Sequence, residues 1–171
     1  SIWIRVNGED LNESLSFTGK GSSKNNFLID ISNYLNNEDE YLSNMYSQNA
    51  ISFKEIIDSL SKEKEYVWNE FINSGDLSEL TEKVTKSSIV YSYANRLERY
   101  ALLRGSNWNS SDSKEYFKYR DELNLNDKDL ILFEPYITYL MNYFNKSVLD
   151  SSQVYFNQKS NTDFSIKKLI L

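Results

Sequence analysis

The 171-residue sequence contains neither cysteine nor histidine. Without them the chain has no thiol chemistry, no Cys- or His-based metal site, no Ser-His-Asp triad and no histidine general base. Packing alone, without disulfides, must therefore hold the fold together. The absence of cysteine does not identify the cellular compartment, because a cysteine-free chain is equally compatible with a reducing cytosol and an oxidising envelope.

Turn-forming residues and basic clusters are scarce as well. One proline and five glycines argue against a loop-rich β fold, while 40% hydrophobic residues support a folded core. The net charge of −6, with Lys167-Lys168 as the lone adjacent basic pair, disfavours binding to nucleic acid or to an anionic membrane surface. No apolar run reaches the ~18 residues of a membrane-spanning helix, so we expect no membrane span.

The longest amphipathic stretch covers residues 77–104, and we expect the fold to be built around it. Asp76 is placed to act as its N-cap and Gly105 as its C-cap residue. The apolar positions form two rows at three- and four-residue spacing, and the row shifts between Val84 and Val90. This pattern predicts a helix that is buried on two sides.

Two shorter helices are predicted before the long one. The first covers 23–35 with Ser22 or Ser23 as N-cap, and the acidic residues after it leave open whether it continues to about residue 46. The second covers 53–73 with Ser52 as N-cap. Both are amphipathic, so we expect them to lie along the long helix.

The segments after the long helix are shorter. Residues 106–113 are polar and predict a surface loop in which Trp108 is the anchored side chain. Asp127 is placed to cap a helix that Pro135 interrupts, because proline lacks an N–H and disfavours the α conformation of the residue before it. A further helix is then expected at 136–145.

The amino end alternates between apolar and other side chains, which is typical of a strand with one buried face. Ile2, Ile4 and Val6 mark that face. Leu15 and Phe17 alternate in the same way before a glycine-rich turn, so a short β-hairpin is expected. Because two strands alone are marginally stable in water, we interpret them as part of a larger sheet.

Together these patterns predict a mainly α fold, an irregular helical bundle around a long helix near 77–104. Residues 1–18 are interpreted as the strand remnant of a preceding β domain. Residues 19–171 are interpreted as a helical domain that continues past Leu171, because the last apolar residues look like the opening of another helix.

Three charged clusters have the composition of binding sites but simpler explanations. The acidic run 38–40 would point in different directions on a helix, so a solvated face is expected. Residues 124–129 carry calcium-type oxygen ligands but lack the glycine and the distal glutamate of a calcium loop. The four charged residues within 96–104 (Arg96, Glu98, Arg99 and Arg104) are expected to form ion pairs rather than an anion pocket. No metal or other cofactor is therefore predicted.

Aromatic residues make up 15% of the chain, including thirteen tyrosines. Trp3, Trp68, Trp108 and the tyrosines have the stacking faces that line grooves for sugars or peptides. Most of the tyrosines fall at core spacing, which favours an interior role. An aromatic-lined groove stays open as the alternative.

The stretch Leu15-Ser-Phe-Thr-Gly-Lys-Gly-Ser-Ser-Lys-Asn-Asn-Phe-Leu28 resembles a signature in the amino-terminal regions of TlpA-like thiol-disulfide oxidoreductases of the Bacteroidetes type. Residues 89–93 and 135–143 resemble the helical region that those proteins place between an amino-terminal β domain and a carboxy-terminal thioredoxin domain. In this motif the glycines permit a tight turn, the asparagines bond to its backbone, and the last two residues enter the core. The motif residues, which we expect to be structural, are Phe17, Gly19, Gly21, Asn25, Asn26, Phe27 and Leu28.

The resemblance implies a protein of the periplasm or cell envelope. In that family the chemistry belongs to a Cys-x-x-Cys module, which this chain lacks, so no catalytic residue carries over and the chain itself is not expected to be an enzyme. We expect a non-catalytic module that positions the redox domain or provides an interaction surface. Its partner would be another protein, the parent's own thioredoxin domain or a second copy.

Two other functions stay open at this point. One is an envelope module that binds a peptide or a glycan in an aromatic-lined groove. The other is a carboxylate-based hydrolase, which requires two carboxyl groups that converge in a pocket. The sequence spacing identifies no such pair.

Overall fold

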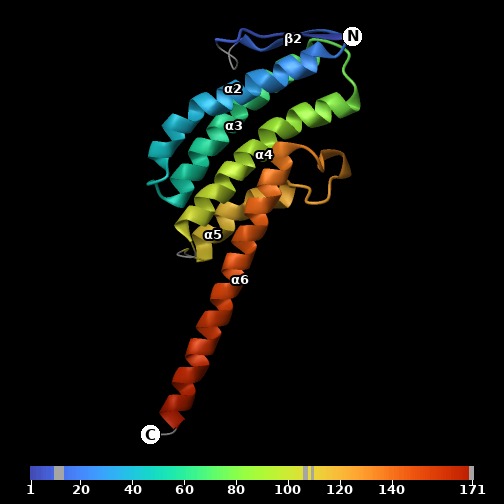
Figure 1. Ribbon diagram of the computed structural model, residues 1–171. Helices are drawn as coiled ribbons and strands as arrows, with labels where there is room; N and C mark the ends of the chain where they lie inside the picture. Colours follow the sequence, from blue (N-terminus) through green and yellow to red (C-terminus); the bar gives the residue numbers. More distant parts are fainter. Residues whose placement is uncertain (10–13, 106–107, 109, 170–171) are drawn as a thin grey trace.

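The computed structural model describes residues 1–9, 14–105, 108 and 110–169, and side chains as far as residue 152 except at 110 and 111. It is 76% helical with a short two-stranded antiparallel sheet, which confirms the mainly α class. Figure 1 shows the elements in chain order. They are β1 (Ile2–Arg5), β2 (Ser16–Gly19), α2 (Ser22–Met45), α3 (Ala50–Asn73), α4 (Glu79–Arg104), α5 (Ser110–Tyr116), the 3-10 helices η1 (Phe117–Glu122) and η2 (Lys128–Leu130), and α6 (Glu134–Leu169).

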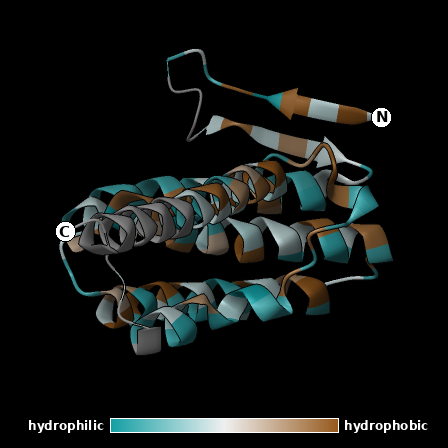
Figure 2. Ribbon diagram, turned by 90° about the horizontal axis from the view of Figure 1, so that it is seen from below, coloured by the Kyte–Doolittle hydropathy of each residue, from teal (hydrophilic) through white to brown (hydrophobic). Residues whose placement is uncertain are grey.

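The expected hairpin is present, with Ile4 of β1 opposite Phe17 of β2. The expected buried face is wrong, because Ile2, Ile4 and Val6 are 50%, 66% and 48% exposed. The helices contact β2 rather than β1, and Figure 2 shows the hydrophobic β1 at the outer edge of the hairpin. Within the described residues nothing covers this strand.

Glycine conformation joins the hairpin to α2. Gly19 and Gly21 have φ angles of 99° and 80°, in the left-handed region that glycine tolerates best. A side chain at Gly19 would also place its Cβ 2.4 Å from the Ser1 carbonyl oxygen. Gly21 is itself the N-cap of α2, so the predicted cap at Ser22 or Ser23 is wrong: both serines already belong to the helix.

Helix α2 is one continuous helix, which the sequence left open, and helix α3 is longer than predicted. Helix α2 continues through the acidic run to Met45, since Ile31 and Leu42 are both buried on the same side of one continuous helix. Helix α3 begins three residues before the expected start, because Asn49 rather than Ser52 is its N-cap. The Asn49 side chain accepts a hydrogen bond from the Ser52 N–H at 3.0 Å.

The central helix is α4, and its two-sided burial is confirmed. One side packs in a cluster with α2, α3 and α5 around Phe53 and Tyr100, and the other side packs with α6 around Tyr91 and Tyr139. Gly105 ends the helix as predicted, with a φ of 67° and its N–H bonded to the Leu102 carbonyl.

The predicted N-cap of α4 is wrong. Ser78, two residues after Asp76, accepts the hydrogen bond from the Thr81 N–H at 3.3 Å. Aspartate and serine cap equally well, so the local sequence alone does not separate the two positions.

The segment after α4 is more ordered than the predicted loop. Helix α5 begins at Ser110, whereas residues 106, 107 and 109 lie outside the described part. Trp108 is anchored as expected: its indole N–H donates to the Gly105 carbonyl at 2.9 Å, and its ring lies 4.8 Å from that of Tyr116.

Asp127 is an N-cap as predicted, although of the three-residue η2, and its side chain accepts from the Asp129 N–H. Pro135 lies in the first turn of α6, where a backbone N–H has no hydrogen-bond acceptor within the helix, so proline is tolerated there. The helix therefore begins at Glu134, close to the predicted start at 136. The predicted end at 145 is wrong, because α6 continues to Leu169. The side chains beyond 152, and residues 170–171, lie outside the described part.

Stacked aromatic rings form much of the main cluster, so an interior role for these residues is confirmed. Phe53 lies 4.3 Å from Tyr100, and Phe27 lies 4.3 Å from Phe71, measured between ring centroids. Among the described helices, none has the length and hydropathy needed to span a membrane.

Replacing Phe53 by alanine should lower the free energy of unfolding by about 3–5 kcal/mol, because a fully buried ring is lost and a cavity remains. Urea denaturation followed by circular dichroism measures this change. Tyr66→Ala, at an exposed position of α3, is the matched control and should change stability by less than ~0.5 kcal/mol. Equal effects of the two substitutions would contradict the packing described.

Candidate functional site

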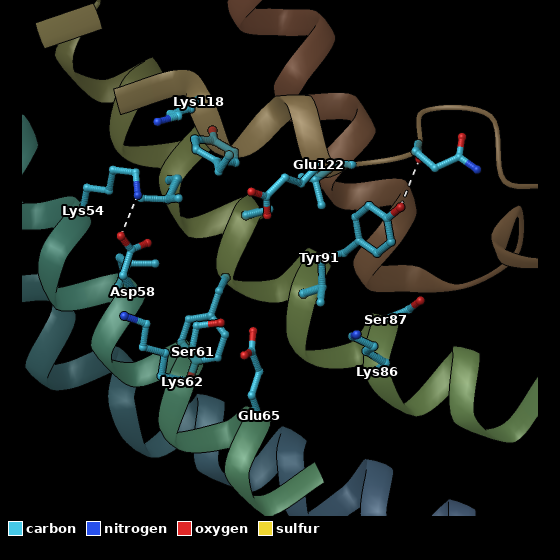
Figure 3. A pocket seen from close by; sticks show the side chains of 18 of the residues that line it. Lys54, Asp58, Ser61, Lys62, Glu65, Lys86, Ser87, Tyr91, Lys118 and Glu122 are labelled. Atoms are coloured by element: carbon cyan, nitrogen blue, oxygen red, sulfur yellow. Dashed lines mark hydrogen bonds and ion pairs between the residues drawn. The ribbon is translucent and has the colours of Figure 1, made fainter. Parts of the chain in front are cut away.

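An open groove of about 820 Å³ lies between α3, α4 and the segment formed by α5 and η1. Figure 3 shows charged side chains from both walls around it. The groove is formed by helix surfaces that belong to the bundle itself, so it is present without a conformational change. A cavity of this size fits a short stretch of peptide or a small molecule.

The floor of the groove is apolar. Ile57 comes from α3, and Val90, Ala94 and Leu97 come from α4. The three α4 residues are spaced by four and three positions, so they share one helical face. Ile57 and Leu97 are also core residues, which makes the floor an outer layer of the core. Among the four, Val90 is partly exposed while the others are nearly covered, so Val90 is the position at which an apolar side chain of a ligand can be accepted.

Two ion-pair clusters fix parts of the rim. Lys54 and Asp58 pair at 2.5 Å along one face of α3. On α4, the Lys83 ammonium binds Asp127 at 2.7 Å and Asp129 at 2.6 Å. Hydrogen bonding to these two aspartates raises the pKa of Lys83, and its hydrogen bond to Asp127 lowers the pKa of that carboxyl. This cluster ties η2 to α4.

Other charged residues of the rim are not paired. Within the described residues, those without an ion pair, a side-chain hydrogen bond or a contact with an aromatic ring are Lys62, Glu65, Glu115, Lys118 and Glu122. They belong to opposite walls, since the first two are on α3 and the others on α5 and η1. Charges of both signs are therefore available to a ligand, and no ion pair must break first.

Three tyrosines complete the lining, and their hydroxyls are used within the fold. Tyr91 donates to the Asn124 carbonyl at 3.0 Å, Tyr93 to Glu38 at 2.8 Å and Tyr119 to Glu98 at 2.8 Å. Burial is the main cause that raises the pKa of each hydroxyl above its ordinary value. These phenols stay protonated as wall residues.

A buried ion pair holds the η1 wall against α4. The Glu98 side chain is fully buried, and Arg120 binds it with two parallel bonds of 2.7 and 2.6 Å. Burial lowers the pKa of Arg120 while bonding to Glu98 raises it, and the net direction is upward. The guanidinium also contacts two aromatic rings, at 4.0 Å from the centroid of Phe117 and 4.8 Å from that of Tyr143.

A second network joins α2, α3 and α4. Glu38 accepts from Arg96 at 2.5 Å and pairs with Lys64 at 3.1 Å, while Arg96 also binds Asp39 at 2.9 Å. The expected solvated face for residues 38–40 is therefore wrong for Glu38, whose carboxylate is turned to the buried cations of two neighbouring helices.

Most of the other charged candidates are engaged in contacts within the fold. The prediction that Arg96 and Glu98 each form an ion pair is confirmed, although Glu98 forms its pair in the interior rather than at the surface. The expected ion pairing is wrong for Arg99 and Arg104, which have no ion pair within the described residues and lie over the rings of Tyr46 and Tyr100. Within 124–129, Asp127 and Asp129 bind the ammonium of Lys83. Within the described part of the chain, no three acidic residues converge as metal ligands.

The sequence motif of residues 17–28 lies at the junction of hairpin and α2, away from the groove. Asn26 clamps the backbone of Phe17, accepting from its N–H at 2.7 Å and donating to its carbonyl at 2.9 Å. Asn25 makes no such bond within the described residues. Phe27 is buried, and Leu28 borders a smaller groove of about 360 Å³ between α2, α4 and the start of α6.

The tryptophans lie elsewhere. Trp3 is exposed on β1, the Trp68 indole donates to Thr85 at 3.0 Å, and Trp108 belongs to the main cluster. Among the described residues that line the larger groove, the aromatic ones are tyrosines.

Sequence reasoning missed the charged rim of the groove, although part of its signal was present. Lys54, Asp58, Lys62 and Glu65 are spaced by four, four and three residues, which places them on one face of a helix. Lys118 and Glu122 have the same four-residue spacing. That the two stripes face one another across α4 is a tertiary property.

Comparison of the chain with protein-family models, with curated proteins and with solved structures finds no match.

Replacing Glu98 by glutamine should lower the free energy of unfolding by about 3 kcal/mol, because Arg120 loses its buried counter-charge. Urea denaturation measures this change. Glu115→Gln, at an unpaired rim position, is the control and should stay within ~0.5 kcal/mol of wild type. If the two variants are equally stable, Glu98 does not hold η1 in place.

The salt bridge of Asp127 should appear in the pH dependence of stability. Its pKa is lowered in the fold, so its contribution is complete above about pH 4, the unfolded value, and is lost as the pH falls through the folded pKa. Asp127→Asn keeps a cap acceptor but removes the charge. The stability gap between wild type and this variant should be constant near pH 7 and narrow below about pH 4, as measured by urea denaturation. A gap of equal size at pH 7 and pH 3 would contradict the pairing.

Proposed function

We propose that this chain is a non-catalytic interaction module that holds a peptide segment of a protein partner in the groove between α3, α4 and η1. The observation that carries the proposal is the groove itself, with its apolar floor at Val90 and unpaired charges of both signs on opposite walls. A peptide offers apolar side chains for such a floor and charged ones for such a rim.

The buried ionisable groups around the groove support a binding role over a catalytic one. The carboxylates of Glu98 and Glu38 are each taken up by bonds to arginine, lysine or tyrosine of the neighbouring helices. These bonds fix the walls. Because the groove is already ordered, a ligand binds without the free-energy cost of ordering the walls. The charges that remain available lie at the rim, where they select a partner.

A peptide is favoured over a glycan as the occupant. Sugars are held by stacking on open aromatic faces, most often those of tryptophan. The described lining offers tyrosines whose hydroxyls are bonded within the fold, and Trp68 lies beneath Lys86, 5.1 Å from its ammonium. The charged rim suits a polypeptide of mixed charge.

The resemblance of residues 15–28 supports a family context for this module. We propose that it belongs to a TlpA-like thiol-disulfide oxidoreductase of the periplasm or cell envelope, and that the bound segment comes from the parent's own thioredoxin domain or from a partner protein. Reading the gene downstream of Leu171 tests this part: a thioredoxin-type Cys-x-x-Cys motif is expected there.

The binding proposal is tested with a displayed library of random peptides selected on the 171-residue protein. Enriched peptides should carry apolar residues flanked by charges, and fluorescence anisotropy gives their Kd. Val90→Phe fills the floor and should weaken binding at least about 10-fold, or ~1.4 kcal/mol. Leu80→Phe, at an exposed position of the same helix, is the matched control and should leave Kd unchanged.

A charge test separates groove binding from adhesion to the surface. Exchanging the charges of one wall, with Lys118→Glu and Glu122→Lys together, should weaken the selected peptides while keeping the net charge of the protein. Absence of any enriched peptide, or equal Kd values for Val90→Phe and Leu80→Phe, would contradict the proposal.

A further inference from the structure

Helix α6 exposes a row of large apolar side chains on the face opposite α4. Ile137, Met141, Phe144 and Val148 are 36%, 61%, 53% and 68% exposed. Its other face packs on α4 through Tyr136, Tyr139, Leu140 and Tyr143. Within the described residues nothing covers the exposed row, which we call the α6 seam.

The spacing of the α6 seam is that of a coiled coil. Its four residues follow one another at steps of four, three and four, which are the a and d positions of a heptad. At about 1.5 Å per residue the seam runs for roughly 16 Å along the helix. A row with this periodicity fits a second helix lying nearly parallel to its axis.

The flanks of the α6 seam carry no charge. The neighbouring positions are Thr138, Leu140, Asn145, Ser147 and Ser152. The chain as a whole has a net charge of −6, so two copies repel one another over most approaches. The α6 seam combines exposed apolar area with neutral flanks, which allows a second copy to approach.

We propose that two copies of this chain associate through their α6 seams as an antiparallel helix pair with two-fold symmetry. The seam is self-complementary about the point between residues 142 and 143. In that register Ile137 lies opposite Val148 of the second copy, and Met141 lies opposite its Phe144. A thioether against an aromatic ring is a favourable contact, and the two-fold axis makes each contact twice.

The antiparallel direction follows from the residues at the ends of the seam. Glu134 occupies the next heptad position before Ile137, and Ser151 the next after Val148. A parallel pair would place the two Glu134 carboxylates together, whereas the antiparallel pair places each Glu134 opposite Ser151. Opposed helix dipoles favour the same direction.

None of the seam residues lines the groove between α3, α4 and η1, so this inference does not rest on the proposed function. The seam is short, so a reversible dimer with a Kd in the micromolar range is expected. Sedimentation equilibrium of the 171-residue protein between about 1 and 500 μM should show monomer and dimer in exchange.

Two substitutions test whether the seam carries the association. Met141→Glu with Val148→Glu should raise the dimer Kd at least about 100-fold, because each places a carboxylate against an apolar partner. Tyr66→Glu on α3, where Tyr66 is 66% exposed, is the matched control and should leave the Kd unchanged. Circular dichroism spectra that match wild type show that the variants are folded. A protein that is monomeric throughout, or a dimer that persists in the double variant, overturns the proposal.

The absence of native cysteine allows the register to be read by cross-linking. Ile137→Cys and Val148→Cys are made separately and oxidised alone and as a mixture. The antiparallel register predicts a disulfide-linked dimer in the mixture and little in either protein alone. Cross-linking of each variant with itself, and not with the other, would show a parallel pair and overturn the register.

Discussion

The structure depends on one constraint: α4 is buried on two sides while it carries charged residues that must be neutralised where they lie. Arg96 and Glu98 are two positions apart and therefore point to different neighbours. Arg96 binds Glu38 of α2, and Glu98 binds Arg120 of η1. A buried charge without its partner costs several kcal/mol, so these pairs dictate which elements flank α4.

The same constraint shapes the surface features. Because Glu98 holds η1 and the Glu38 network holds α2 and α3, the elements stay separated over the middle of α4, where the groove lies. Tyrosines of α6 pack on α4 beside the groove, in a cluster with Tyr91 and Ala94, which also line it. One face of α6 contacts α4, and the other face remains exposed. The later part of the helix extends beyond the bundle (Figure 1). Groove and seam are thus two consequences of how α4 is enclosed.

Periodicity allowed much of the fold to be predicted from the sequence, whereas features that depend on long-range contacts were missed. The shift between Val84 and Val90 correctly indicated a helix buried on two sides, because side-chain spacing is a local property. The cap of α4 was misplaced, since Asp76 and Ser78 are equivalent by local chemistry. The Glu38–Arg96 pair joins residues 58 positions apart, and nothing in a single sequence connects them.

Native-state hydrogen exchange tests most directly whether the enclosed α4 organises the molecule. If it does, the amides of residues 85–101 exchange more slowly than those of any other element and at a rate set by global unfolding, while the β-hairpin exchanges through local opening. Exchange from the middle of α4 that is as fast as exchange from the hairpin, or faster than exchange from α2 and α3, would contradict the account.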